Sequence, residues 1–343
     1  MTSRERIIKT LLFETPDRMP ISIWLLPYAV THHPETVKQI QREFPDDMTG
    51  ANGHYNPSPR IKGDPYTIGA YTDEWGCVFD NIQSGAIGEV RKPLLENLDD
   101  WQTLVKPPYE TLPSGGARQI AIDKVNRQVA ETTKFVTSGC CPRPWERYQF
   151  LRGTENAFID VMDPDDSRVR GVIKTIHDFY LKELEFWIRT DVQSLNFMDD
   201  WGSQTQLLIP PPLWRELFKP LYQDYCDLAR SSGKFSFMHS DGCIAAIYPD
   251  LVEIGVNALN SQVFCMDRKR LASIAKGRLA FWGEIDRQHV LTSPDPEVGR
   301  AAVRDYLQHF YDPRGGLFVQ FEFGLGANPA TVLAVLDEFR RHF

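Results

Sequence analysis

The sequence lacks long apolar runs, and it has no run of lysines and arginines. None of its apolar stretches approaches the roughly 20 residues that cross a bilayer. The opening segment, MTSRERIIKTLLFETPDRMP, places charges among its apolar residues, which is untypical of a signal peptide. The net charge is −8, from 38 basic and 46 acidic side chains, so the positive surface that attracts nucleic acid or anionic lipid is missing. We therefore expect neither a nucleic-acid partner nor a membrane partner.

Cysteine is also scarce, with six in 343 residues. They do not have the dense spacing of a small secreted domain held together by disulfides. The adjacent Cys140 and Cys141 form no CxxC motif. Free thiols are typical of a reducing compartment, and we expect a cytoplasmic protein.

The third absence is a glycine-rich phosphate loop, since none follows any predicted strand. This weakens an open, doubly wound sheet as the fold. The hydrophobic fraction of 42% and the charged fraction of 24% are ordinary for a globular protein with a large core. The length fits either two domains or one large α/β barrel.

Short apolar stretches alternate with amphipathic stretches through most of the chain, which predicts parallel strands covered by helices. An eighth strand is expected within 64–92, in a loop-rich part of the sequence. We predict an α/β fold made of a single (β/α)8 TIM-type barrel over 1–343, with a lid insertion at about 45–110. Seven strands are predicted at 21–26, 135–139, 195–200, 235–242, 258–262, 279–286 and 318–324.

Polar residues end most of these strands, and catalytic groups of such barrels sit at the carboxyl ends of the strands. Helix capping is the alternative explanation for about half of them. Asp199 and Asp200 are adjacent, so only one of the two can point into the barrel. The polar strand ends are Asp199, Asp200, His239, Asp241, Asn260, Gln262, Glu284, Asp286 and Glu322.

Several segments together resemble the uroporphyrinogen decarboxylase superfamily, and within it the cobalamin-linked methyltransferases. They are FMDDWGSQTQLLIPPPLWRELFKP, HSDGCIAAIYPDLVEIGVNALNSQ, FWGEIDRQHVL, NPATVLAV and, nearer the N-terminus, YTDEWGCVFDN. The resemblance implies a TIM-type barrel. It also implies one zinc ion, held by a His-x-Cys pair after one strand and by a further cysteine after the last strand. The matching positions in this chain are His239, Asp241 and Glu322, so carboxylates stand in place of both thiolates.

Histidine, aspartate and glutamate are all competent zinc ligands, and three protein ligands with one open position are typical of a catalytic zinc. Oxygen ligands also suit manganese, iron or magnesium. Loss of the metal is the alternative, and Cys243 and Cys265 are possible substitute ligands. Two carboxylates donate less electron density than two thiolates, which makes the metal a stronger Lewis acid and favours an oxygen substrate.

The resemblance implies an enzyme that moves a methyl group between a corrinoid and a small oxygen or thiol substrate, with the metal as Lewis acid. The corrinoid is either free cobalamin or a corrinoid protein. Asp200, Asp241 and Glu284 are the catalytic candidates. For Trp75 and Trp201, packing within a loop is an equal alternative to substrate binding. Candidates for substrate binding are Asp73, Trp75, Trp201, Gln204, Asn260 and Gln262.

Two other functions stay open. The first is a metal-free decarboxylase of a carboxylated substrate. The porphyrin decarboxylases resemble one another in an arginine-rich RQAGRY stretch, where this chain has SIWLLPYA without a cation. The second is a non-catalytic barrel that binds a corrinoid or another ligand. Against it, Glu322 within FVQFEFG would need a partner if it is buried.

Overall fold

A closed barrel of parallel strands is the centre of the computed structural model, which describes residues 1–53, 58–107 and 114–343. Six strands pair in the order β10-β9-β8-β7-β6-β2, and β1 pairs with β11. A parallel bridge from Phe281 of β10 to Leu317 joins the two sheets on one side, and a bridge from Ile21 to Val319 extends the pairing of β1 with β11. On the other side, the Asp47 N–H donates to the carbonyl of Ile21 at 2.8 Å. The barrel strands are β1 (Trp24–Leu25), β2 (Met48–Gly50), β6 (Phe135–Thr137), β7 (Ser194–Met198), β8 (Phe235–Ser240), β9 (Ala258–Ser261), β10 (Ala280–Phe281) and β11 (Glu322–Phe323).

The predicted barrel is confirmed, but the eighth strand expected within 64–92 is wrong. It is β2, which precedes that range and is too short to show a pattern. The 64–92 stretch instead forms an antiparallel sheet of β3 (Gly69–Thr72), β4 (Val78–Asn81) and β5 (Glu89–Val90). Residues of β4 alternate between exposed and buried, as in a sheet with one solvated face, whereas the barrel strands β6 and β9 are buried on both faces. We call β3, β4 and β5 the lid sheet. The predicted lid range also includes 54–57 and 108–110, which lie outside the described residues.

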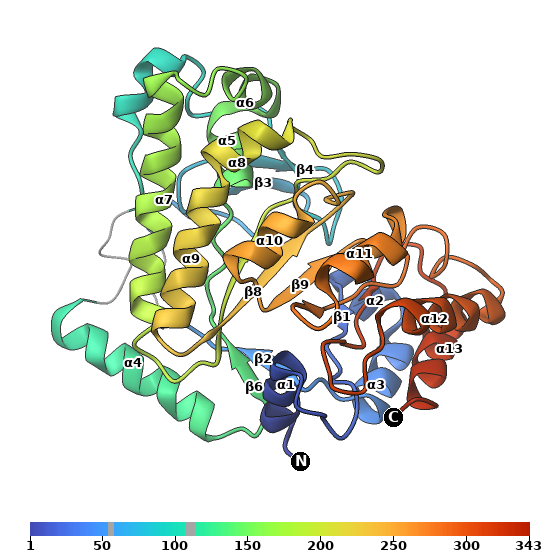
Figure 1. The fold of residues 1–343 in the computed structure, drawn as a ribbon. Helices are drawn as coiled ribbons and strands as arrows, with labels where there is room; N and C mark the ends of the chain where they lie inside the picture. The colour runs from blue at the N-terminus through green and yellow to red at the C-terminus, as the bar shows by residue number, and fades with distance from the viewer. Residues whose placement is uncertain (54–57, 108–113) are drawn as a thin grey trace.

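Helices surround the barrel (Figure 1). The first begins with a capping box between Thr2 and Glu5. Within the described ranges, no helix is long and apolar enough to cross a membrane. The α-helices are α1 (Ser3–Leu12), α2 (Pro27–His32), α3 (Pro34–Glu43), α4 (Gly115–Ala130), α5 (Pro144–Arg152), α6 (Thr154–Asp160), α7 (Ser167–Trp187), α8 (Pro211–Leu217), α9 (Lys219–Ser231), α10 (Tyr248–Ile254), α11 (Arg268–Ala275), α12 (Pro296–Phe310) and α13 (Pro329–Arg340).

The barrel interior is filled from one end by apolar side chains. Ile7 and Leu11 of α1 share a buried cluster with Phe135 of β6, Phe237 of β8 and Phe318 of the segment before β11. Side chains two residues apart on a strand point to the same side. The residues two and four positions after each of these phenylalanines therefore also point into the barrel. They lie nearer to its opposite end, where the strands finish. The first helix thus closes the floor of the barrel, and the polar strand ends form its mouth.

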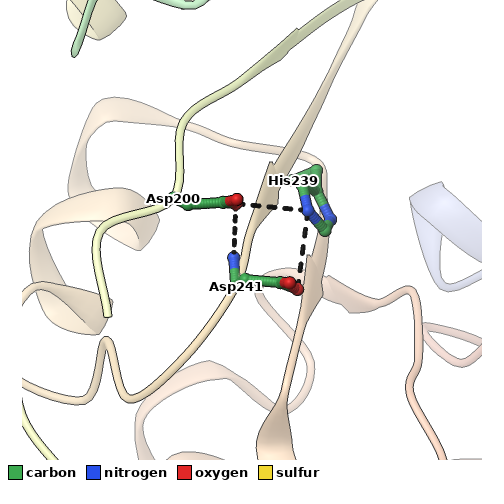
Figure 2. Close-up of side chains that lie close together, drawn as sticks. All are labelled: Asp200, His239 and Asp241. Atoms are coloured by element: carbon green, nitrogen blue, oxygen red, sulfur yellow. Dashed lines mark hydrogen bonds and ion pairs between the residues drawn. The ribbon is translucent and has the colours of Figure 1, made fainter. Parts of the chain in front are cut away.

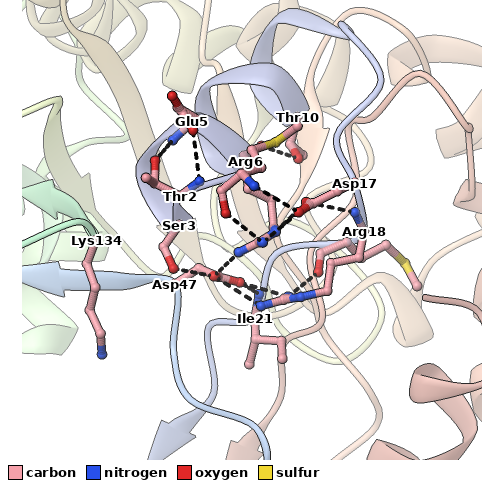
Figure 3. A network of polar contacts seen from close by, with 12 residues as sticks. Thr2, Ser3, Glu5, Arg6, Thr10, Asp17, Arg18, Ile21, Asp47 and Lys134 are labelled. Atoms are coloured by element: carbon pink, nitrogen blue, oxygen red, sulfur yellow. Dashed lines mark hydrogen bonds and ion pairs between the residues drawn. The ribbon is translucent and has the colours of Figure 1, made fainter.

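A buried carboxylate ties the floor together (Figure 3). Asp47 is 1% exposed. It accepts hydrogen bonds from Ser3 Oγ and Arg6 Nη1 at 2.6 Å, and from Arg18 Nη1 at 2.9 Å. It also accepts the backbone N–H of Ile21 at 2.8 Å. One side chain therefore joins α1, the start of the first strand and the segment before β2.

We expect Asp47→Ala to lower the free energy of unfolding by about 3 to 5 kcal/mol, because it removes one member of a buried, charged hydrogen-bond network. Urea unfolding followed by circular dichroism measures the change. Asp337→Asn, on the exposed side of α13, is the matched control and should change stability by less than about 0.5 kcal/mol. Equal stability of the two variants would contradict the role of Asp47.

Candidate functional site

Three side chains from two neighbouring strands meet at the barrel mouth (Figure 2). His239 Nε2 lies 3.4 Å from Asp200 Oδ1 and 3.6 Å from Asp241 Oδ1. The possible ligand atoms of the three residues lie within 4.8 Å of one another. Strands β7 and β8 pair with Met198 opposite His239, so Asp200 and Asp241 each follow two residues later on the same side of their strands. We call Asp200, His239 and Asp241 the mouth triad.

The ring of His239 has a defined orientation. Its Nδ1 lies 2.5 Å from Oδ1 of Asn260, whose amide nitrogen donates to the carbonyl of Trp282. An amide oxygen can only accept, so Nδ1 carries the proton. Nε2 is then left to face the two carboxylates, either with a lone pair or with a second proton. Metal-binding histidines are commonly fixed in this way by a partner of the other ring nitrogen.

His239 and Asp200 each stabilise the charged form of the other, which shifts both pKa values. Burial lowers the pKa of His239, but its hydrogen bond to Asp200 and the charges of Asp241 and Asp200 outweigh burial and raise the pKa to about 9. Burial raises the pKa of Asp200, yet the hydrogen bond and charge of His239 hold that pKa below its ordinary value. In protein without bound metal, the imidazole is therefore positively charged at neutral pH.

Glu322, the third ligand implied by the resemblance, lies outside the triad. Its carboxylate is paired with the guanidinium of Arg287, which also binds Oδ2 of Asp241. Oδ1 of Asp241 is buried and has no hydrogen-bond partner in the described chain. Asp241 therefore turns one oxygen to the arginine and leaves the other toward His239.

Glu284 is the most isolated acid of the mouth. It is 1% exposed, and neither oxygen has a hydrogen-bond partner among the residues that the structure describes. Burial raises its pKa to about 8, opposed by Arg287 and supported by Glu322 and Asp241. Glu284 is therefore mostly protonated at neutral pH and can serve as a proton donor. Asp286, the alternative at this strand end, accepts backbone N–H groups of the following turn.

Asp199 has the structural role left open for one of the two adjacent acids. It is buried and accepts the N–H groups of Trp145 and Glu146 at 2.8 and 2.7 Å, and the hydroxyl of Tyr222 at 2.6 Å. It caps α5, a helix that precedes it in the chain. Asp200 is the acid that faces the mouth.

The two predicted tryptophan contacts are packing residues. Trp201 is fully buried, is stacked on Trp145 with ring centres 5.2 Å apart, and donates its Nε1–H to Tyr222 at 2.8 Å. Trp75 is 1% exposed and packs edge-on against Phe179. Neither indole has surface left for a substrate.

The other four residues predicted to bind substrate lie in different environments. Asn260 supports His239, and Gln262 accepts the N–H of Gly242 at 3.0 Å, so both are buried supports of the mouth. Gln204 is exposed in the loop after β7. Asp73 accepts the backbone N–H groups of residues 75, 76 and 77 and pairs with Arg147, which anchors the lid sheet to α5.

Sequence reasoning did not find Arg287. Its position directly after the predicted strand 279–286 was a usable signal, because loops after barrel strands build the mouth. Its target was not visible, since Asp241 and Glu322 come from strands distant in the chain.

The fold and the mouth define a (β/α)8 barrel with an ionisable site at the carboxyl ends of its strands. The chain belongs to the uroporphyrinogen decarboxylase family, whose model matches residues 68–342. The resemblance seen in the sequence is thereby confirmed.

The similarity to one solved structure supports the same architecture. A methyltransferase from Methanosarcina mazei is similar over 99% of each chain, with a TM-score of 0.66 and 15% sequence identity. A xylanase from Thermoanaerobacterium saccharolyticum covers 93% of this chain and 95% of its own, with a TM-score of 0.40 and 10% identity. A dihydropteroate synthase from Burkholderia cenocepacia covers 48% of this chain and 61% of its own, with a TM-score of 0.32 and 14% identity. A search of curated proteins finds no match.

The raised pKa of Glu284 makes the free energy of unfolding depend on pH. Its pKa is raised in the folded protein, so between about pH 5 and pH 8 the unfolded chain releases this proton more readily and stability falls as pH rises. Glu284→Gln should remove this dependence and stabilise the protein at pH 8 by on the order of 2 kcal/mol. Urea unfolding at pH 5 and pH 8 measures the difference. The exposed Glu216→Gln is the control, and a parallel pH dependence in all three proteins would contradict the assignment.

Proposed function

We propose that this protein is a metal-dependent methyltransferase that moves a methyl group between a corrinoid and a small oxygen or thiol substrate. The observation that carries the proposal is the mouth triad, in which one imidazole and two carboxylates converge at the carboxyl ends of barrel strands. The similarity of fold to a methyltransferase from Methanosarcina mazei supports it. The corrinoid, as free cobalamin or a corrinoid protein, remains an inference from the family branch.

The triad fits a divalent metal. Nε2 of His239 is available as a metal ligand because the ring proton is on Nδ1, which donates a hydrogen bond to Oδ1 of Asn260. Oδ1 of Asp241 is buried without a hydrogen bond in the described part of the chain, and such an atom favours a cation as neighbour. One nitrogen and two oxygen ligands suit zinc and also harder ions such as manganese or iron. Asp200 thus takes the ligand position that the sequence assigned to Glu322.

When bound, the metal would polarise the substrate oxygen or lower the pKa of a substrate thiol. The remaining roles belong to the chain itself. Arg287 holds the second oxygen of Asp241 and keeps this carboxylate in one orientation. Glu284 carries a proton at neutral pH and would supply it to the oxygen that loses its methyl group. Water exclusion comes from the buried walls around Glu284 and Asn260.

The first test is the metal content of protein purified without chelator. We expect near-stoichiometric zinc or another divalent metal in the native protein and in Glu322→Gln, because Glu322 pairs with Arg287. His239→Ala and Asp200→Ala should lose it, since each removes a ligand. Absence of metal from the native protein after reconstitution would contradict the proposal. Metal loss in Glu322→Gln alone would instead restore Glu322 as the ligand.

The second test concerns the support of His239. Asn260→Ala leaves all three ligands in place but removes the acceptor of the Nδ1 proton, and we expect metal affinity to fall by about 10- to 100-fold. Competition with a chromophoric chelator measures the affinity. Gln204→Ala, in the exposed part of the same mouth, is the control. An unchanged affinity in Asn260→Ala would show that the ring is held by other contacts.

A metal-free decarboxylase is favoured by one specific observation. Glu284 is buried without a hydrogen-bond partner among the described residues and is mostly protonated at neutral pH, so it is a proton donor that needs no metal. Glu284 would then protonate the carbon that loses carbon dioxide. Carbon dioxide release by metal-free protein, abolished in Glu284→Gln, would establish this function in place of methyl transfer.

A further inference from the structure

A cavity of about 540 Å³ lies between the lid sheet, α5, α7 and the loop after β6. It opens over the carboxyl end of β6, so it belongs to the same mouth of the barrel as the triad. Part of its wall is aromatic, and the rest carries ionisable groups. The lining side chains used below are Phe79, Phe150, Phe179, Arg143, Arg147 and Glu183.

The first arginine of the cavity is already neutralised. Arg147 is buried and pairs with Asp73, and it pairs with Glu74 at 2.8 Å. Its guanidinium also lies over the ring of Phe150, 5.4 Å from the ring centre. This group joins the lid sheet to α5 and has no charge to offer a ligand.

The second arginine is different. Arg143, the residue before α5, is 33% exposed and faces the cavity. Among the described residues its guanidinium pairs with Glu146 alone, at 3.6 Å, which is longer than a hydrogen bond. An arginine presents five N–H donors in a planar fork that matches a carboxylate. Arg143 therefore offers an anion a bidentate site.

Glu183 also lines the cavity and does not cancel the charge of Arg143. Burial raises the pKa of Glu183 to about 8, and the charge of Glu74 adds to this, while Arg147 and Arg143 oppose it. Glu183 is thus mainly a neutral carboxylic acid at pH 7 and can donate a hydrogen bond. Burial also raises the pKa of Cys141 to about 12, so the thiols of the cavity carry no charge.

The remaining walls suit a flat ring. Phe79 packs edge-on against Phe150, with ring centres 5.0 Å apart, and Phe179 lines the same cavity. Aromatic rings contact one another favourably in edge-to-face and offset geometry. A pocket of this size with apolar walls and a few placed polar groups is typical of a small-molecule site.

We propose that this cavity binds a small aromatic carboxylic acid, with its carboxylate on Arg143 and its ring among Phe79, Phe150 and Phe179. The inference rests on the proposed function only in calling this ligand the substrate. Glu146 connects the two sites, because its side chain lies beside Arg143 and its N–H bonds to Asp199, the neighbour of Asp200.

Isothermal titration calorimetry of the full-length protein tests the proposal without turnover. The probes are 4-methoxybenzoate, the uncharged 4-methoxybenzamide and the cation phenyltrimethylammonium. We expect 4-methoxybenzoate to bind at least about 10-fold more tightly than the other two, because a charged hydrogen-bonded pair contributes more than a neutral one. Preference for the cation, or equal binding of acid and amide, would overturn the proposal.

Variants locate the binding site. Arg143→Gln should weaken 4-methoxybenzoate by about 10- to 100-fold and leave the amide unchanged. Arg189→Gln, at an exposed position two residues after the end of α7, is the matched control. Glu183→Gln keeps a neutral donor and should bind the acid within about 3-fold of the native protein, whereas Glu183→Ala should not. Circular dichroism checks folding, and full affinity in Arg143→Gln would overturn the proposal.

The two proposals can fail separately. Binding of 4-methoxybenzoate to a protein that never holds metal would support this cavity and contradict the metal-dependent function. Stoichiometric metal at the mouth triad, together with no preference for the acid, would leave the function standing and overturn the aromatic acid as its substrate.

Discussion

The arrangement of the mouth depends on one constraint, the register of parallel strands β7, β8 and β9. Met198 lies opposite His239, and His239 lies opposite Asn260. Because side chains alternate along a strand, a slip of one residue would turn the imidazole toward the surrounding helices. Apolar residues two positions earlier, such as Phe237, fill the barrel and resist such a slip. The packing of the floor therefore determines which polar groups meet at the top.

The same alternation explains what the sequence could predict. Seven barrel strands were found because each is an apolar run with a polar end, and His239, Asp241 and Asp200 lie at two of those ends. Strand β2 was missed because its three residues show no such run. Trp201 was ambiguous because burial depends on Trp145 and Tyr222, which are distant in the chain. The pairing of Arg287 with Glu322 could not be predicted because a long side chain from a loop chooses its partner only in the folded barrel.

Charge balance connects the triad to its surroundings. With Glu284 protonated, the mouth contains three ionised carboxylates, those of Asp200, Asp241 and Glu322, against the fixed cation Arg287. A protonated His239 leaves one negative charge uncompensated. Under our proposal, a divalent ion with a neutral His239 would make the whole group electrically neutral, which is the favourable state for charges removed from water. Glu322 would then contribute to the site through Arg287 without touching the metal.

The first helix has a consequence for how the barrel forms. Leu11 of α1 shares a cluster with Phe318, and the carbonyl of Thr10 accepts the N–H of Gly316 at 2.8 Å. These partners are separated by about 300 residues along the chain. Contacts of such long sequence separation form slowly, because a large loop must close before they contribute. The contacts of α1 with Gly316 and Phe318 would therefore form after its contacts with Asp47 and Phe135, and the floor of the barrel would be completed last.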